Sequence, residues 1–273
     1  MDAQPTRVLA VANQKGGVGK TTVTVGLAEI YALHQDRRVL VVDADPQRNT
    51  TAALGVTNAE FTLNDVLYGD ADDGQRIHPG SAAAAIVPTG DLWQTDGPGR
   101  IDVIASERNL AARERDSMIA REARLRTALR GVVENYDVVL IDCPPSLGML
   151  TVNAMTASTF AVLVTEPRVA SFDGVKEIAR TMVEVNEAFN ESLGVAGIVV
   201  NKTRKGRTDQ EMWMRRMVEE YGELLIEPAL PDREVFSKAH AEFRPLISFG
   251  PSARSGIAPL GRIADKIWEG SQQ

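Results

Sequence analysis

The sequence is poor in cysteine and in long apolar runs. Its single cysteine is Cys143, so no disulfide can form within the chain. No apolar stretch approaches the roughly 20 residues that a membrane-spanning helix needs. The N-terminal MDAQPTRVLAVAN lacks the basic start and long apolar core of a signal peptide. Together these absences predict a cytoplasmic protein.

Positive charge is also in short supply, since 30 basic residues against 37 acidic ones give a formal net charge of −7. This excludes a protein coated in basic surface. It does not exclude a local basic patch, because nucleic acid responds to the patch more than to the total. With 44% hydrophobic residues the chain can bury a substantial core, and we expect one domain over residues 1–273.

Short apolar runs rich in β-branched residues alternate with longer helical patterns. Near-continuous apolar runs are typical of strands buried on both faces, as in parallel sheets. The expected strands are 7–13, 38–45, 101–106, 136–143, 160–165 and 195–201, and the expected helices are 21–34, 107–130, 171–189 and 208–222. This alternation predicts an α/β fold with a doubly wound, mostly parallel sheet flanked by helices. Residues 69–99, rich in Gly, Pro, Asp and Ala, are expected to form a surface excursion.

The stretch NQKGGVGKTT, residues 13–22, predicts a phosphate-binding loop between a strand and a helix. Its second half fits the pattern G-x-x-x-x-G-K-[ST], but Gln14 stands where that pattern has its first glycine. The glycines let backbone N–H groups approach phosphate oxygens, and the helix N-terminus favours an anion. The residues expected to bind phosphate and Mg²⁺ are Gly16, Gly17, Gly19, Lys20, Thr21 and Thr22, with the Thr21 hydroxyl as a Mg²⁺ ligand.

Lys15 is a second lysine in a loop that already contains Lys20. Because it precedes the glycines, it cannot easily fold back onto the phosphates of its own loop. It could reach a nucleotide held by a facing subunit, where positive charge stabilises the transition state of phosphoryl transfer. The alternative is an ordinary solvated surface lysine.

Carboxylates follow two of the expected strands. Asp43 and Asp45 stand two residues apart in VLVVDADPQ, and Asp142 ends the apolar run in VVLIDCPPS. Ligands in open α/β sheets bind outside the carboxyl ends of strands. We expect Asp45 to orient the attacking water, and Asp43 and Asp142 to support Mg²⁺; capping or turn aspartates are the alternative for Asp43 and Asp45. Cys143 is expected to pack rather than react.

The segment KGGVGKTT resembles the deviant Walker A motif of the ParA/MinD group of P-loop ATPases. The resemblance implies that Lys15 crosses a dimer interface to the partner's nucleotide, that Val18 belongs to the nucleotide loop, and that Asp45 of D-x-D-P is catalytic with Lys15 and Lys20. It also implies adenine contacts from Asn201 in GIVVNKT and from the LPDREV loop, at Pro231 and Asp232. Arg204 stands where a GTPase N-K-x-D motif has its aspartate, which favours ATP over GTP.

The stretch NYDVVLIDCPPSLGMLTVNAMTAS is similar to chromosomal ParA proteins of the Soj type. The early phosphate loop leads us to expect no N-terminal helix-turn-helix domain. MinD is the close competitor and binds membranes through a basic amphipathic C-terminal helix. The tail here has charges that sum to zero over 260–269, so we expect it to pack on the domain, with no membrane partner. The nitrogenase iron protein shares the loop but needs two cysteines per subunit.

The resemblance implies a DNA partition protein that requires ATP and Mg²⁺. An ATP-bound homodimer would bind double-stranded DNA nonspecifically on the nucleoid, and a ParB-like partner would stimulate its slow hydrolysis and release it. The expected DNA contacts are Lys202, Arg204, Lys205 and Arg207 of NKTRKGR, and Lys238. Ordinary solvated charge is the alternative for NKTRKGR. Two other functions stay open: positioning of a protein cargo, and a MinD-like membrane-associated regulator.

Overall fold

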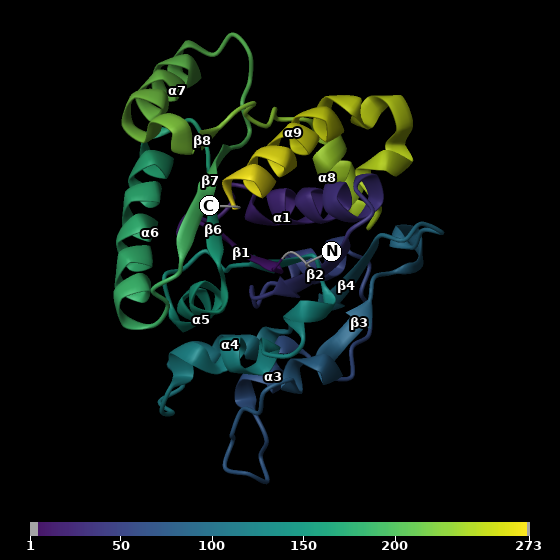
Figure 1. Ribbon diagram of the computed structural model, residues 1–273. Coiled ribbons are helices and arrows are strands. Elements are labelled where there is room, and N and C mark those ends of the chain that lie inside the picture. The colour runs from purple at the N-terminus through teal and green to yellow at the C-terminus, as the bar shows by residue number, and fades with distance from the viewer. Residues whose placement is uncertain (1–4, 272–273) are drawn as a thin grey trace.

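In the described part of the chain, eight strands form one sheet in the order β3-β4-β2-β5-β1-β6-β7-β8, and all neighbours are parallel except β3 and β4. The computed structural model describes residues 5–271 (Figure 1). The strands are β1 Arg7–Ala12, β2 Arg38–Asp43, β3 Ile86–Pro88, β4 Arg100–Ile104, β5 Val138–Asp142, β6 Phe160–Thr165, β7 Gly194–Val200 and β8 Leu225–Ile226. The predicted α/β class is confirmed, and each of the six predicted strands is present.

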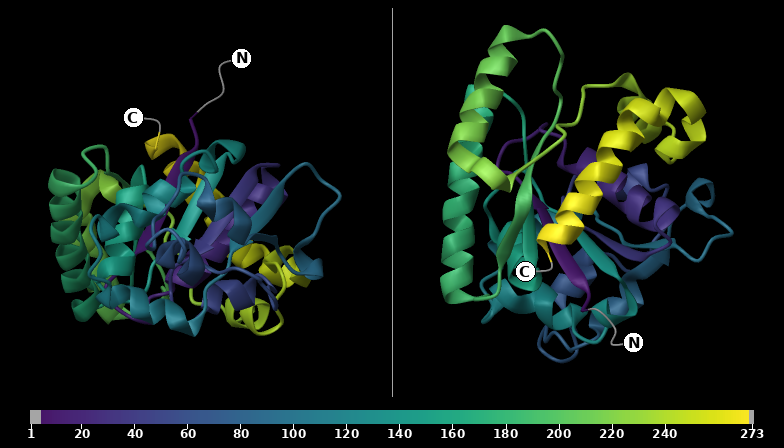
Figure 2. Two further views of the ribbon diagram at one scale, coloured as in Figure 1. Left: turned by 90° about the horizontal axis from the view of Figure 1, so that it is seen from below. Right: turned by 45° about the horizontal axis from the view of Figure 1, so that its top comes forward.

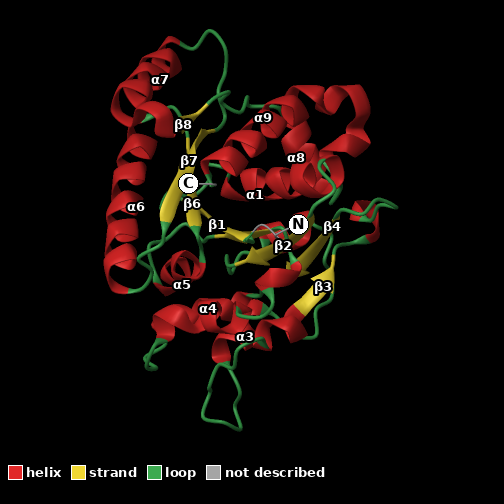
Figure 3. Ribbon diagram, in the orientation of Figure 1, coloured by secondary structure: helices red, strands yellow, loops and turns green. Residues whose placement is uncertain are grey.

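Helices cover both faces of the sheet, as Figure 3 shows. They are α1 Lys20–Glu29, α2 Asn49–Ala53, α3 Leu63–Tyr68, α4 Arg124–Leu129, α5 Met149–Ala157, α6 Val169–Ala188, α7 Thr208–Tyr221, α8 Glu234–Ala241 and α9 Arg254–Gly270. Side chains of α1, α8 and α9 pack against one face, and those of α3 to α7 pack against the other. The strands are therefore buried on both sides, which explains their continuous apolar runs.

The C-terminal helix α9 lies across the sheet beside α1 (Figure 2). Leu260, Ile263 and Ile267 are fully buried in the core of that face. The ring of Trp268 is stacked by two guanidinium groups, those of Arg7 at 3.4 Å and Arg37 at 3.3 Å. The prediction that the tail packs on the domain is confirmed. Within residues 5–271, no helix is both long and apolar enough to cross a membrane.

The prediction of one long helix over 107–130 is wrong. The segment forms two 3-10 helices, Arg108–Arg115 and Arg121–Ala123, followed by α4. Ala120 has a left-handed backbone with φ 58°, which no continuous helix allows. Arg124 is buried and donates to the carbonyls of Leu67, Tyr68 and Gln75, so the chain is held by tertiary contacts that its charge pattern does not reveal.

Residues 69–99 contribute more than surface loops. They include the 3-10 helix Ser81–Ala85 and the short strand β3, which pairs antiparallel with β4 at the edge of the sheet. Trp93 is buried, and its indole N–H donates to the carbonyls of Ala53 and Phe243 at 3.0 Å each. Neither this strand nor this buried tryptophan was predicted from the sequence.

Candidate functional site

The loop between β1 and α1 forms one wall of a cleft of about 640 Å³. Gly17 and Gly19 have left-handed backbones, with φ 80° and 93°. A Cβ on Gly19 would lie 2.0 Å from Nδ2 of Asn201, so no side chain fits there. The phosphate-loop residues predicted from the sequence lie along this cleft, except the buried Val18: they are Gly16, Gly17, Gly19, Lys20, Thr21 and Thr22.

Lys20 begins α1 and is 7% exposed, with its ammonium 3.4 Å from the carbonyl of Lys15. Burial lowers the pKa of Lys20, and the charge of Asp142 opposes that shift. A buried ammonium at the N-terminus of a helix, beside the backbone of a glycine-rich loop, is suited to bind an anion entering the cleft.

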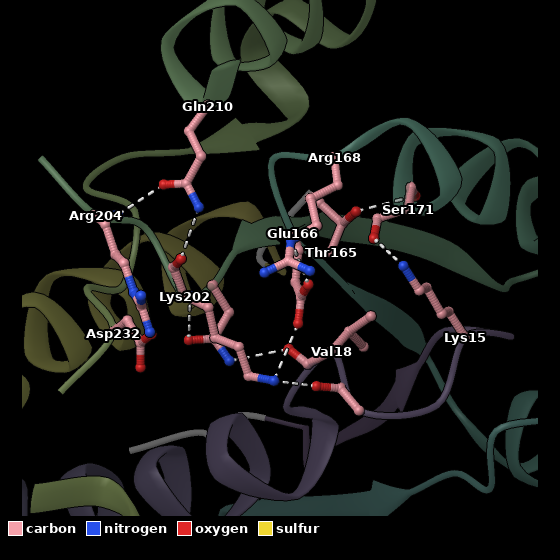
Figure 4. Close-up of polar contacts among 12 residues, drawn as sticks. Lys15, Val18, Thr165, Glu166, Arg168, Ser171, Lys202, Arg204, Gln210 and Asp232 are labelled. Atoms are coloured by element: carbon pink, nitrogen blue, oxygen red, sulfur yellow. Dashed lines mark hydrogen bonds and ion pairs between the residues drawn. The ribbon is translucent and has the colours of Figure 1, made fainter. Parts of the chain in front are cut away.

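Lys15 is directed away from its own phosphate site. Its ammonium donates to Oγ of Ser171 in α6 at 3.2 Å, and its backbone N–H donates to Asn13 at 2.8 Å. Figure 4 shows the side chain extended toward Ser171. The helix predicted to start at residue 171 begins earlier, because α6 starts at Val169. Ser171 thus lies within the helix, where its hydroxyl accepts the hydrogen bond from Lys15.

Asp142 ends β5 beneath the loop and is 1% exposed. Its Oδ2 accepts from Thr21 at 2.7 Å and from Thr50 at 2.5 Å, and its Oδ1 accepts from Thr24 at 3.3 Å. Burial raises the pKa of Asp142, and the hydrogen bonds from Thr50 and Thr21 oppose the rise. A carboxylate and a hydroxyl in contact at the base of a phosphate loop supply the oxygen ligands that Mg²⁺ prefers.

Asp43 lies beside Asp142 at the ends of neighbouring strands, and its bonds go to the turn after β2. Register pairs it with Asp142 on the neighbouring strand, but it is fully buried and does not line the cleft. Its Oδ2 accepts from the Thr51 N–H at 2.7 Å and hydroxyl at 2.6 Å, and its Oδ1 accepts from the Asp45 N–H at 3.1 Å. Burial and repulsion from Asp142 raise the pKa of Asp43 to about 7. Asp43 thus holds the turn between β2 and α2, and its support of Mg²⁺ stays a prediction.

Asp45 does line the cleft, with Lys20 and Thr21. Its Oδ1 accepts from the Gln47 N–H at 2.9 Å, and its carbonyl accepts from Ser106 at 2.7 Å, so the turn that carries it is fixed. Pro145 lies on the same wall. Cys143 is fully buried, and burial raises the pKa of its thiol, which agrees with a packing role.

The residues predicted to contact adenine surround the end of β7. Asn201 directs its amide at the phosphate loop, where Nδ2 donates to the Val18 carbonyl at 2.9 Å. Pro231 and Asp232 lie beside Thr203 and line a neighbouring groove of about 1070 Å³. Their contact with adenine stays a prediction. The link from Asn201 to the phosphate loop was not predicted.

The cations predicted to contact DNA differ in their surroundings. Lys202 lines the nucleotide cleft, where its ammonium donates to the Gly17 carbonyl and pairs with Glu166 at 3.0 Å, and its contact with DNA stays a prediction. Arg204 and Lys205 line the neighbouring groove. Arg204 pairs with Asp232 at 2.6 Å, and the exposed Arg207 and Lys238 pair with Asp209 and Glu234.

Three residues of the site were missed in the sequence. Thr50 joins Asp142, Glu166 joins Lys202, and the buried Gln210 holds the NKTRKGR loop. Glu166 had a readable signal, because it follows the apolar run of β6 directly, as Asp142 ends that of β5. Gln210 and Thr50 stand in polar stretches that give no such signal.

Comparison with known proteins gives matches over most of the chain. A family model described as an AAA domain matches residues 6–195. The chain is 33% identical to the sporulation initiation inhibitor protein Soj of Bacillus subtilis, over 91% of this chain and 93% of Soj. It is 35% identical to the chromosome partitioning protein ParA of Caulobacter vibrioides, over 91% of this chain and 89% of that protein.

Two solved structures show the same architecture. Cobyrinic acid a,c-diamide synthase from Mycobacterium smegmatis with bound ADP and magnesium superposes with a TM-score of 0.70 at 32% identity, over 88% of this chain and 91% of that one. A variant of Cyanothece McdA in complex with ATP gives a TM-score of 0.78 at 21% identity, over 98% of this chain and 97% of that one. The second likeness supports the fold alone.

Proposed function

The chain belongs to the family of ParA- and Soj-type P-loop ATPases, and from that premise we propose that it is an ATP-dependent DNA partition protein. MgATP binding closes a homodimer with the nucleotides between the subunits, and this dimer binds DNA without sequence preference. A ParB-like partner stimulates hydrolysis, and the subunits separate and leave the DNA. The observation that carries the proposal is the cleft that Lys20, Thr21 and Asp45 line together. The phosphate loop in this cleft contains a second lysine, Lys15.

The residues at the base of the cleft fit a magnesium ion. Thr21 and Asp142 place a hydroxyl and a buried carboxylate 2.7 Å apart at the helix N-terminus. When bound, Mg²⁺ would supply positive charge that neutralises the charge developing on the phosphates. Thr21 would be a direct ligand and Asp142 would hold the ion's hydration shell. Asp43 stabilises the turn that presents Asp45.

The chain's own residues divide the remaining work of hydrolysis. Backbone N–H groups of the loop bind the phosphates, and Lys20 places positive charge beside the transferred group. Asp45, fixed by Gln47 and Ser106, orients the attacking water in the cleft. Lys15 leaves Ser171 and reaches the nucleotide of the facing subunit, so that ATP binding and dimer formation become one event.

The groove next to the NKTRKGR loop is the surface that we assign to DNA. Its cations come from three parts of the chain, and its acidic side chains are Asp232 and Glu234. Arg204, Lys205, Arg233, Arg254 and Arg262 line it. Lysine and arginine side chains on one surface are what nonspecific phosphate binding requires. The MinD-like alternative loses its support, because the apolar face of α9 is occupied by the core.

The test is DNA binding by the purified protein with ATP, with ADP and without nucleotide, on two unrelated duplexes over a salt series. Binding only with ATP, equal on both duplexes and falling steeply with salt, is expected. Absence of binding in every nucleotide state would refute the DNA role and leave the ATPase. Light scattering in the same three states measures dimer formation.

A further inference from the structure

Two successive carbonyls of the phosphate loop are held by two successive residues at the end of β7. Asn201 Nδ2 donates to the carbonyl of Val18 at 2.9 Å, and the Lys202 ammonium donates to the carbonyl of Gly17. Figure 4 shows the Lys202 side chain extended toward the loop near Val18. Two side chains that follow β7 therefore hold the backbone of the phosphate loop by hydrogen bonds.

These two hydrogen bonds fix the direction of the N–H groups in the loop. In a planar trans peptide the C=O and the N–H point in opposite directions. When Lys202 holds the Gly17 carbonyl, the Val18 N–H is turned the other way, and Asn201 acts likewise on the Gly19 N–H through the carbonyl of Val18. Backbone N–H groups of this loop are the donors expected to bind phosphate. The two side chains thus pre-orient phosphate donors from behind.

Lys202 has a strained backbone conformation, which indicates a specific role for its side chain. Its backbone is left-handed, with φ 57°, which is strained for a residue with a side chain. The ammonium also pairs at 3.0 Å with Glu166, whose side chain is 8% exposed and also contacts Arg168 at 3.4 Å. A buried carboxylate directly after β6 therefore keeps the lysine aimed at the loop.

The same residue starts the basic segment 202–207. The buried Gln210 of α7 donates to the Lys202 carbonyl at 3.3 Å and accepts from the Arg204 N–H at 2.7 Å. Arg204 in turn pairs with Asp232 at the wall of the groove assigned to DNA. A continuous chain of contacts thus joins the Gly17 carbonyl to that groove (Figure 4).

We propose that Lys202 is a positioning residue for the phosphate loop, and that it couples the state of that loop to the basic segment 202–207. The inference rests on the proposed function, since it assumes that the loop binds ATP and that the groove binds DNA. Lys202 acts through the Gly17 carbonyl. Loss of this hydrogen bond speeds the release of nucleotide and lowers the ratio of DNA affinities with ATP and with ADP.

The experiment compares Lys202→Met, Lys202→Arg and the control Lys205→Met in the full chain. Lys205 lies in the same segment with the same charge, but it is exposed and lines the neighbouring grooves rather than the nucleotide cleft. The first readout is the rate at which mant-ADP dissociates when chased with excess ADP and Mg²⁺. The second is the salt slope of DNA binding with ATP and with ADP.

Lys202→Met should release mant-ADP about tenfold faster, as expected for loss of a partly exposed, charge-assisted hydrogen bond. Its ATP-to-ADP ratio of DNA affinity should fall toward one. Lys202→Arg, which can donate to the same carbonyl, should restore both. Lys205→Met should keep the wild-type release rate while reducing the salt slope by about one.

The proposal is overturned if Lys202→Met keeps the wild-type release rate and lowers only the salt slope, because Lys202 would then be a DNA contact. If Lys202→Met does not fold, Glu166→Gln decides: it leaves the lysine in place but removes its partner, and unchanged release would overturn the proposal. Failure of the wild-type protein to bind mant-ADP would refute the proposed function itself, which separates the two outcomes.

Discussion

Replacing Gly19 with alanine tests the packing of the phosphate loop against the end of β7. A Cβ there would lie 2.0 Å from Nδ2 of Asn201, so the Asn201 amide must leave its hydrogen bond to Val18. Gly17 is the matched control, because its φ is also positive, at 80°, yet a Cβ there meets nothing within 4 Å. Both variants place alanine in a left-handed backbone, and only one displaces Asn201.

The expected loss of stability has two contributions, the left-handed alanine and the displacement of Asn201. A left-handed alanine costs about 1 kcal/mol in either variant. Displacing Asn201 leaves the buried Val18 carbonyl without that donor, which adds about 2 kcal/mol for Gly19→Ala. At roughly 2 °C per kcal/mol for a chain of this size, Gly17→Ala should lower the Tm by about 2 °C and Gly19→Ala by about 6 °C.

Thermal unfolding followed by circular dichroism measures the difference, and a double variant identifies its cause. If Asn201 is the obstacle, Gly19→Ala with Asn201→Ala should be less destabilised than the sum of the two single variants by about 2 kcal/mol, because both single variants lose the same hydrogen bond. Equal Tm values for the two glycine variants, or strict additivity in the double variant, would refute the reasoning.

Three further predictions concern the cleft. Lys15→Ala should bind nucleotide within about threefold of wild type, since Lys15 contacts Ser171 rather than its own phosphate site, yet form no ATP-dependent dimers by light scattering; wild-type dimers would contradict its role across the interface. Asp45→Ala should lower single-turnover hydrolysis by about 100-fold and leave a long-lived ATP dimer, and normal hydrolysis would remove Asp45 from the mechanism. Burial lowers the pKa of His240 below its ordinary 6.5, so at acid pH the unfolded chain binds more protons than the folded chain. The free energy of unfolding should therefore fall as pH drops below about 6.5, less so in His240→Gln, and denaturant titrations giving both proteins the same pH slope would refute this.

The parts of the fold that sequence predicted are those in which local pattern and tertiary environment agree. The run at 38–45 became β2, Arg38–Asp43, because a parallel strand is covered on both faces and therefore needs apolar side chains throughout. The phosphate loop was predictable for a different reason. Its glycines, lysines and threonines follow each other in the chain, so their spacing alone states the geometry.

Prediction failed where distant contacts decide the structure. The segment 107–130 has a helical composition, but the buried Arg124 binds three carbonyls from residues 67–75 and the chain turns at Ala120. Strand β3 lies in a Gly- and Pro-rich segment, and only pairing with β4 makes it a strand. Asp43 and Asp45 look equivalent in sequence, yet two bonds from Thr51 turn the first into a support for the turn.

Lys202 shows how the order of strands turns a charge pattern into a site. Four cations within six residues, 202–207, predict a basic surface when only the sequence is known. In the sheet, β1, β6 and β7 are adjacent and parallel, so the segments that follow them emerge at the same edge. The phosphate loop follows β1, Glu166 follows β6, and Asn201 and Lys202 follow β7. The first cation of the basic segment thus faces a carboxylate and the loop, and Arg204 and Lys205 line the groove. A nucleotide-dependent change at the loop therefore needs to cross only one residue, Lys202, to reach the segment that we assign to DNA.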